Sequence, residues 1–445
     1  MTAYWCETAL LDGVATPSVR LGVDDGRFVE VDVHDPEPSD RRLPGITVPG
    51  LANAHSHAFH RALRSRTHGE GGSFWTWRDE MYRAAGRLDP DSYRALARAT
   101  FAEMALAGIT TVGEFHYLHH QRDGIRYDDA NAMGHAVIAA AADAGIRITL
   151  LDAAYLHGGL GDDGYAALAG VQRRFGDGTI EAWAERVEDI APAEHVRIGA
   201  AIHSVRAVDP AAAAIVADWA RTNGRPLHAH VSEQPAENAR CRAVHGVTPT
   251  RLLADAGAIG QTFTAVHATH LDTDDVVALG AATVCLCPTT ERDLGDGIGP
   301  CRELVGAGAR LTLGSDSHAA IDLFEEARAV ELDERLRSVE RGVVAPEDLL
   351  RAATVDGHRS LGWSDVGAFA VGQRADLVTV STDSVRLAGV RPGHALAAIV
   401  LAASAADVTS VVIDGRVVVA DGRHTAIDVV HELDTAICDL MEGAA

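Results

Sequence analysis

Short apolar runs alternate with alanine-rich amphipathic segments along the middle of the chain, from about residue 50 to residue 363. The apolar runs predict strands at residues 110–115, 147–152, 196–202, 226–230, 263–267, 283–287 and 310–315. Between them, apolar residues recur at helical spacing, for example over residues 90–107, 130–144 and 210–222. This alternation of strand and helix, repeated about eight times over roughly 300 residues, predicts an α/β fold of the (β/α)8 TIM-barrel type.

Both ends of the chain have a different pattern, because short β-prone segments follow one another there without long helices. These segments are residues 4–10, 19–23 and 28–33 at one end, and 372–380, 397–401 and 408–420 at the other. A final amphipathic helix is expected at about residues 426–442. We therefore predict three parts: residues 1–48 as the first part of a small composite β-sandwich domain, 49–363 as the barrel, and 364–445 as the rest of the sandwich with the terminal helix.

The composition predicts a globular protein that does not bind nucleic acid. Of 445 residues, 47% are hydrophobic, and the 63 acidic and 39 basic residues give a formal net charge of −24. Such an acidic chain is repelled by nucleic acid and by anionic membranes. No apolar stretch approaches the ~18 residues of a membrane span, and the sequence does not open on a signal-peptide pattern. The six cysteines are scattered, so we expect a cytoplasmic protein with reduced thiols.

Every basic residue of the chain is an arginine, and lysine is absent. Schiff-base catalysis and a P-loop are therefore excluded, since both require a lysine. A pair of metal ions bridged by a carbamylated lysine is excluded for the same reason.

Histidine and carboxylate side chains stand at the C-terminal ends of separate predicted strands. In chain order they are His55, His57, His230, Glu233, His267 and Asp316. Each one alone has a plain explanation, because the chain has 22 histidines and an aspartate after a strand often caps the next helix. Together they would meet at one rim of the barrel, where TIM-barrel enzymes have their active sites. The order HxH, HxxE, H, D therefore predicts a metal site with acid/base groups beside it.

This set of residues resembles the amidohydrolase superfamily, and the resemblance spans essentially the whole chain. The terminal segments GQRADLVTV and VVIDGRVVVADGR are similar to the composite sheet domain of that superfamily. Many members bind two metal ions across a carbamylated lysine, so the absence of lysine leaves the mononuclear, deaminase-like type. The resemblance then implies that one zinc ion per subunit is held by His55, His57, His230 and Asp316. Three imidazoles and a carboxylate suit zinc, and the same donors are also compatible with iron.

Longer motifs resemble the formimidoylglutamate deiminase family in particular. They are NAHSHAFHRALR, GSFWTWRDEMY, GITTVGEFHYLHH, IHSVRAV, HVSEQPAEN, CPTTERDLGDGIGP and LGSDSH. That family converts N-formimino-L-glutamate and water to N-formyl-L-glutamate and ammonia in histidine degradation. His60 stands where the family pattern has glutamine, which bears on fine specificity. The superfamily resemblance also implies a homodimer.

The expected chemistry assigns roles to the remaining groups. Asp316 and His267 would accept a proton from the attacking water, and Glu233 would carry a proton to the leaving nitrogen. A dicarboxylate substrate needs local positive charge in so acidic a protein, and Arg206 is the best placed arginine, followed by Arg78. Three further groups could donate hydrogen bonds to the substrate: His60, Tyr117 and His203.

Two other functions fit parts of the same pattern. A mononuclear deaminase of a nucleobase or another heterocyclic amine would share the metal site, but it would favour aromatic and amide contacts over Arg206 and Arg78. A barrel that has lost catalysis could serve as a binding module, but such a chain would be expected to lack one of the catalytic positions.

Overall fold

The computed structural model describes residues 2–67 and 74–443. Eight strands form a parallel sheet that curls into a barrel, in the order β5-β6-β7-β10-β11-β12-β13-β14. They are β5 (Leu51–Ser56), β6 (Ile109–His116), β7 (Arg147–Ala154), β10 (Val196–Ile202), β11 (Leu227–Val231), β12 (Phe263–His267), β13 (Thr283–Leu286) and β14 (Arg310–Leu313). Nearly all of their residues are buried, as expected for parallel strands covered on both faces. The predicted barrel is confirmed.

Asp316, three residues after the end of β14, closes the barrel between its first and last strands. Asp316 forms a parallel bridge with Ser56. Its N–H donates to the carbonyl of His55 at 3.0 Å, and its own carbonyl accepts from the N–H of His57 at 3.2 Å. Three candidate metal ligands, His55 at the end of β5, His57 just after it and Asp316 beyond β14, are therefore joined by backbone hydrogen bonds.

Helices surround the barrel, and their first turns show why they begin where they do. Asp89, Asp209 and Thr248 each accept a backbone N–H of the helix that follows, and each is followed by a proline at the first helical position. The helices along the barrel are α2 (Pro90–Leu106), α3 (Ala132–Ala144), α4 (Ile180–Glu188), α5 (Pro210–Thr222), α7 (Pro249–Asp255), α8 (Thr273–Leu279), α10 (Cys301–Ala307), α11 (Leu323–Ser338), α12 (Pro346–Ala353) and α13 (Val355–Ser360).

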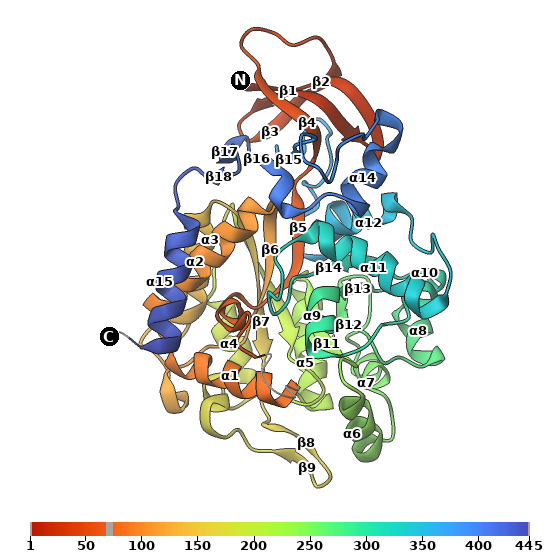
Figure 1. Cartoon of the computed structure of the whole chain (residues 1–445). Helices are drawn as coiled ribbons and strands as arrows, with labels where there is room; N and C mark the ends of the chain where they lie inside the picture. The colour runs from red at the N-terminus through yellow and green to blue at the C-terminus, as the bar shows by residue number, and fades with distance from the viewer. Residues whose placement is uncertain (1, 68–73, 444–445) are drawn as a thin grey trace.

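Shorter elements lie around the C-terminal ends of the barrel strands. They are the 3-10 helix η1 (Ala58–Leu63), α1 (Phe74–Arg87), the hairpin β8 (Gly159–Gly161) and β9 (Gly164–Ala166), α6 (Pro235–His245) and α9 (Pro288–Leu294). In Figure 1, α1, α6 and the hairpin lie at the end of the barrel opposite the second sheet.

The second sheet contains both ends of the chain, in the order β18-β17-β16-β15-β4-β1-β2-β3. Its strands are β1 (Thr2–Leu11), β2 (Val14–Asp24), β3 (Arg27–Val33), β4 (Arg41–Pro49), β15 (Leu377–Val380), β16 (Val408–Ile413), β17 (Arg416–Ala420) and β18 (Arg423–His424). The strand β4 pairs with β1 on one side and with β15 on the other, so it joins the two chain ends. One residue, Gly50, separates β4 from the barrel strand β5. The exact divisions predicted at residues 48/49 and 363/364 stay proposals.

One strand expected near the C-terminus is a helix. The segment predicted to be a strand at 397–401 lies in α14 (Ala395–Leu401), where Ala395, Ala398 and Ile399 are buried. These positions recur at i, i+3 and i+4, so the helical period decides the structure of an alanine-rich run that also fits a short strand. The terminal helix is present as α15 (Val429–Glu442) and packs against α2, with an ion pair between Arg98 and Glu432. Within the described residues, none of the helices is both long and apolar enough to span a membrane.

A buried cluster of charges joins the base of the barrel to the second sheet. Arg147, at the start of β7, contacts the carboxylates of Asp376 and Asp414 at 3.2 and 3.0 Å, and its guanidinium lies 5.5 Å from the ring centroid of Trp363. Since Arg147 and Asp376 are almost completely buried, each charge depends on the other for its stabilisation.

We expect Arg147→Met to lower the free energy of unfolding by about 3–5 kcal/mol, because the fully buried carboxylate of Asp376 would lose its cation. Denaturant titration measures this change. The control is Arg94→Met, since Arg94 forms an exposed pair with Asp143 and its loss should cost less than about 1 kcal/mol. Equal, small losses for both variants would contradict a role for Arg147 at the junction.

Candidate functional site

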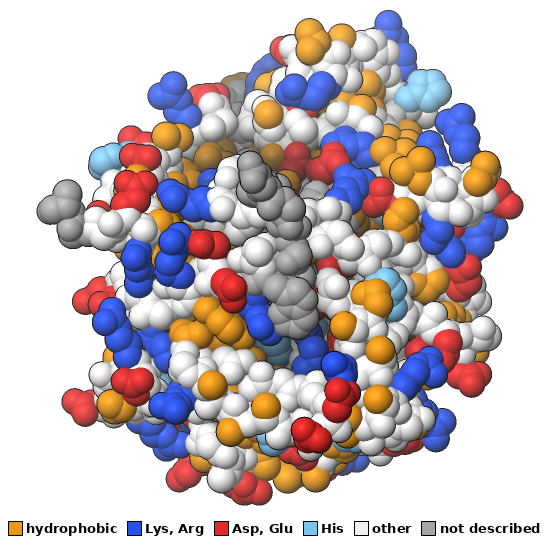
Figure 2. Space-filling model, turned by 60° about the horizontal axis from the view of Figure 1, so that its bottom comes forward, with side chains coloured by type: hydrophobic (Ala, Val, Ile, Leu, Met, Phe, Trp, Pro, Cys, Tyr) orange, Lys and Arg blue, Asp and Glu red, His pale blue; other side chains and the backbone are white. Residues whose placement is uncertain are grey.

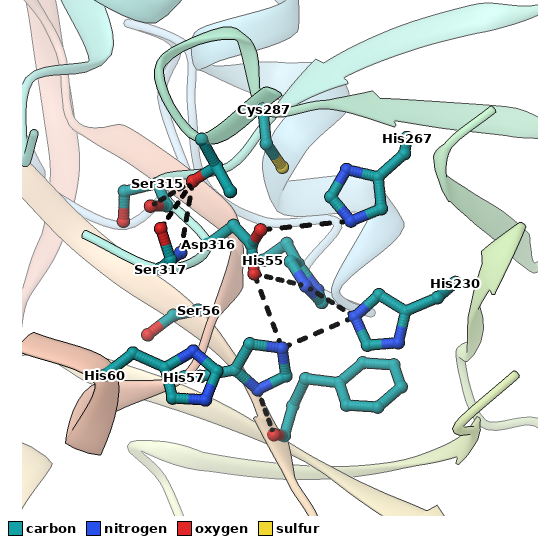
Figure 3. Close-up of polar contacts among 12 residues, drawn as sticks. His55, Ser56, His57, His60, His230, His267, Cys287, Ser315, Asp316 and Ser317 are labelled. Atoms are coloured by element: carbon teal, nitrogen blue, oxygen red, sulfur yellow. Dashed lines mark hydrogen bonds and ion pairs between the residues drawn. The ribbon is translucent and has the colours of Figure 1, made fainter. Parts of the chain in front are cut away.

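The four predicted metal ligands lie together at the C-terminal rim of the barrel (Figure 3). The Nε2 atom of His230 is 3.1 Å from Nε2 of His55 and 3.4 Å from Nε2 of His57. The Oδ1 atom of Asp316 is 3.2 Å from Nε2 of His55 and 3.4 Å from Nε2 of His57. All four side chains are buried, so three ring nitrogens and one carboxylate oxygen surround a common point away from bulk water.

For two of the three rings, those of His57 and His230, a hydrogen bond to a backbone carbonyl determines which nitrogen faces that point. The Nδ1–H of His57 donates to the carbonyl of Phe115 at 2.9 Å, and the Nδ1–H of His230 donates to the carbonyl of His203 at 2.7 Å. A carbonyl can only accept, so the proton of each neutral ring is on Nδ1 and the lone pair on Nε2 faces the centre.

Burial keeps these rings neutral. It lowers the pKa of His55 to about 3 and the pKa of His230 well below its usual value. The facing lone pairs of the neutral imidazoles repel one another and the nearby carboxylate unless a cation lies between them. The donor set therefore fits a divalent metal ion, and three nitrogens with one oxygen are typical of zinc sites.

A second buried group brings His116, His119 and Asp152 close together, but it has a different character. Both carboxylate oxygens of Asp152 already accept hydrogen bonds from the guanidinium of Arg186, at 2.8 Å each. The arginine supplies the positive charge there, so this group is an ion pair within the packing of the barrel.

His267, predicted to be a catalytic residue, lies on the other side of Asp316. Its Nε2 atom is 3.9 Å from Oδ2 of Asp316, and its Nδ1 atom is 3.4 Å from Oε1 of Glu291. The backbone of His267 has φ +67° and that of Asp316 has φ +39°, a left-handed conformation that is rare outside glycine and that often marks functional sites.

A cavity of about 450 Å³ opens above this centre. Ten of the predicted site residues line it: His57, His60, Arg78, Tyr117, His203, Arg206, His230, Glu233, His267 and Asp316. His55 completes the ligand set below them. Figure 2 shows basic and histidine side chains gathered in a hollow on this face. The structure thus brings together every residue that the sequence predicted for the site.

Arginine, aromatic and carboxylate side chains share the wall of the cavity. The Nη2 atom of Arg206 donates to Oε2 of Glu233 at 3.0 Å. Arg78 lies over the ring of Tyr82, with its guanidinium carbon 5.5 Å from the ring centroid. His60 and the hydroxyl of Tyr117 are hydrogen bonded, with 2.7 Å between His60 Nε2 and the oxygen.

Two residues that line the cavity, Glu237 and Gln172, were not predicted from the sequence. Glu237 accepts the backbone N–H of Glu233 at 3.2 Å, and burial raises the pKa of Glu237 to about 6. The sequence does contain a signal for Glu237, because this residue follows Glu233 by four positions within HVSEQPAEN. Gln172 donates to the hydroxyl of Tyr82 and to the carbonyl of Gly158, at 3.0 Å each. Nothing in the local pattern around Gln172 marks it, because its partners come from distant segments.

The sequence and the fold of this chain also match those of known proteins. A sequence model of the Amidohydrolase family matches residues 46–418, so this chain belongs to the amidohydrolase family. It is 38% identical over 440 residues to the formimidoylglutamate deiminase of Pseudomonas aeruginosa, with 95% of this chain and 96% of that protein covered.

Two further relatives place the chain within the same family. It is 30% identical over 382 residues to the 5-methylthioadenosine/S-adenosylhomocysteine deaminase of Pelotomaculum thermopropionicum, with 84% of this chain and 80% of that protein covered. The crystal structure of an amidohydrolase from Brucella melitensis superposes with a TM-score of 0.88 at 30% identity, over 99% of this chain and 100% of that one. The chain is accordingly a hydrolase that acts on C–N bonds.

We expect a chelator to lower the melting temperature of the protein and one equivalent of Zn²⁺ to restore it. A ligand at about 100 times its Kd stabilises the folded state by about 2.7 kcal/mol. In His230→Ala, zinc should no longer raise the melting temperature, because one of four donors is lost. The control is His228→Ala, since Nε2 of His228 faces the carbonyl of Ser360 in the core. A zinc response that survives in His230→Ala would contradict the ligand set.

Proposed function

We propose that this protein hydrolyses N-formimino-L-glutamate to N-formyl-L-glutamate and ammonia, a step of histidine degradation. One observation carries the proposal: a centre of three imidazole lone pairs and a carboxylate lies in a cavity lined by Arg206 and Arg78. The identity with the Pseudomonas aeruginosa deiminase, which covers nearly the whole of both chains, supports the choice of reaction. A cytoplasmic location and a homodimer stay predictions.

In this proposal His55, His57, His230 and Asp316 hold one divalent ion, for which zinc is the expected metal. When bound, such an ion makes water a stronger acid and so supplies a nucleophile at neutral pH. The rest of the chemistry belongs to the side chains around the centre. The oxygen of water adds to the formimino carbon, the bond from that carbon to the terminal nitrogen breaks, and the nitrogen leaves as ammonia.

Asp316 and His267 take the proton that the attacking water loses. The 3.9 Å between Oδ2 of Asp316 and Nε2 of His267 is short enough for the two groups to act on one water molecule. Water loses its two protons in turn, one when it attacks and one when the C–N bond breaks, and Glu233 passes them from the wall of the same cavity to the departing nitrogen, which leaves as NH3. Each proton removed from water thus has an acceptor, and the leaving group has a donor.

The two substrate carboxylates require the arginines. Arg206 can offer two parallel N–H groups to one carboxylate, and in this structure it donates to Glu233. Arg78, on α1, also lines the cavity and is the second candidate. His60, Tyr117 and His203 add neutral donors, which suit the carboxylates without further charge.

The direct test is ammonia release from N-formimino-L-glutamate by zinc-loaded protein, with 5'-methylthioadenosine, adenosine, guanine and cytosine as parallel substrates. We expect release from the formimino compound alone. Release only from a ring substrate would replace the proposed reaction with that of the nucleoside and nucleobase deaminases, which are also similar in sequence.

Glu233→Gln should keep its metal content and lose at least about 100-fold in kcat, because the amide cannot carry the proton to nitrogen. Steady-state kinetics and metal analysis of the same preparation measure both quantities. Near-normal kcat with the metal in place would remove Glu233 from the mechanism.

Arg206→Met should raise KM for N-formimino-L-glutamate by about 10- to 100-fold, which corresponds to the loss of a charge-assisted hydrogen bond of about 1.5–3 kcal/mol. Arg240→Met is the matched control. Arg240 also lines the cavity, but it pairs with Asp162 at the tip of the β8–β9 hairpin, and an exposed pair contributes little. The same rise in KM in both variants would contradict a specific role for Arg206.

A further inference from the structure

The buried carboxylate of Glu291 contacts His267 at the ring nitrogen that does not face the metal centre. Its Oε1 atom is 3.4 Å from Nδ1 of His267, whereas Nε2 of the same ring is 3.9 Å from Oδ2 of Asp316. Figure 3 shows one ring nitrogen of His267 directed at Asp316 and the other directed away from it. Both His267 and Glu291 are buried, so water does not compete freely for this contact.

The position of Glu291 is determined by its own helix rather than by His267. Glu291 lies in the first turn of α9, and its Oε1 atom also accepts the backbone N–H of Cys287 at 2.9 Å. Cys287 follows β13, which pairs in parallel with β12, the strand that ends at His267. The strand pairing and the helix start therefore bring a fixed acceptor to the imidazole.

We propose that Glu291 is a positioning residue for His267 in the hydrolytic reaction, an inference that rests on the proposed function for its kinetic part. By accepting the Nδ1 proton, Glu291 leaves Nε2 as the atom that gives or takes a proton beside Asp316. It also opposes rotation of the ring, which would exchange the two nitrogens. Without this acceptor the proton can reside on Nε2, and the base would then be directed away from the water.

The same three side chains, His267, Cys287 and Glu291, also bring possible ligand atoms together. Two observations favour a hydrogen bond over a second ion. The Oε1 atom that would bind such an ion already accepts from Cys287, and Nδ1 of His267 is within hydrogen-bond reach of the same oxygen. A second ion is therefore one of the outcomes that the experiment must detect.

The chain contains a matched control for removing Glu291. Glu326, on α11, is also buried and also accepts at the start of α9, from the backbone N–H of Thr289 at 2.9 Å and from its hydroxyl. Glu291→Leu and Glu326→Leu both remove a buried carboxylate that accepts a backbone N–H at the start of α9. Of these two glutamates, Glu291 alone contacts His267, so a purely structural effect should be similar in the two variants.

We expect both leucine variants to lower the melting temperature and to retain one metal ion per chain. Glu291→Leu alone should lower kcat by about 100-fold or more with little change in KM, which is the scale of losing a correctly protonated base. Glu291→Gln should recover most of that loss, because its amide oxygen can accept from both Cys287 and His267. These kinetic measurements use as substrate the compound that the unmodified protein hydrolyses.

A readout without turnover makes the inference independent of the substrate. In zinc-loaded protein labelled with ¹⁵N-histidine, the signals of His267, assigned by their loss in His267→Gln, should report a proton on Nδ1. That signature should be lost in Glu291→Leu and kept in Glu326→Leu. Failure of the unmodified protein to release ammonia from N-formimino-L-glutamate would count against the proposed function, but it would leave this comparison intact.

Three results would overturn the inference. The first is an unchanged Nδ1 signature and kcat in Glu291→Leu. The second is an equal loss of kcat in Glu326→Leu, which would make the effect one of helix stability. The third is two metal ions per chain in the unmodified protein with one fewer in Glu291→Leu, which would make the cluster a metal site.

Discussion

The closure of the barrel by the backbone of Asp316 is the constraint on which the rest of the site depends. Two hydrogen bonds from this residue hold it against His55 and His57, and the same residue carries the fourth donor group. Closing the barrel therefore places three of the four metal ligands at once. His230 joins them from β11, because the carbonyl of His203, just beyond the neighbouring strand β10, orients its ring. The hydrogen bonds that close the barrel therefore also position the metal ligands.

The chain's charges are distributed so that this centre can exist in an acidic protein. Lysine is absent, so every side chain with a permanent positive charge is an arginine. Buried arginines such as Arg147 and Arg186 stabilise carboxylates within the packing, whereas Arg78 and Arg206 line the cavity. The imidazoles at the centre stay neutral because burial lowers their pKa. The site thus presents lone pairs to a cation and guanidinium groups to an anion.

Much of this arrangement follows from the sequence, and the part that does not has a physical reason. The strands at 196–202 and 263–267 were predicted within their observed bounds, because buried parallel strands are continuous apolar runs. The ligands were found because they end such runs. The segment at 397–401 is a helix rather than a strand, since alanine-rich runs fit both periods. Glu291 and Gln172 were missed because their partners are set by tertiary contacts between distant segments.

The central claim is that one metal ion lies between the four donor groups at the point where the barrel closes. Anomalous diffraction at the zinc edge, on crystals of the zinc-loaded protein, tests it most directly. We expect a single strong peak bounded by Nε2 of the three histidines and Oδ1 of Asp316. A protein that binds no zinc, or a peak located elsewhere in the chain, would contradict it.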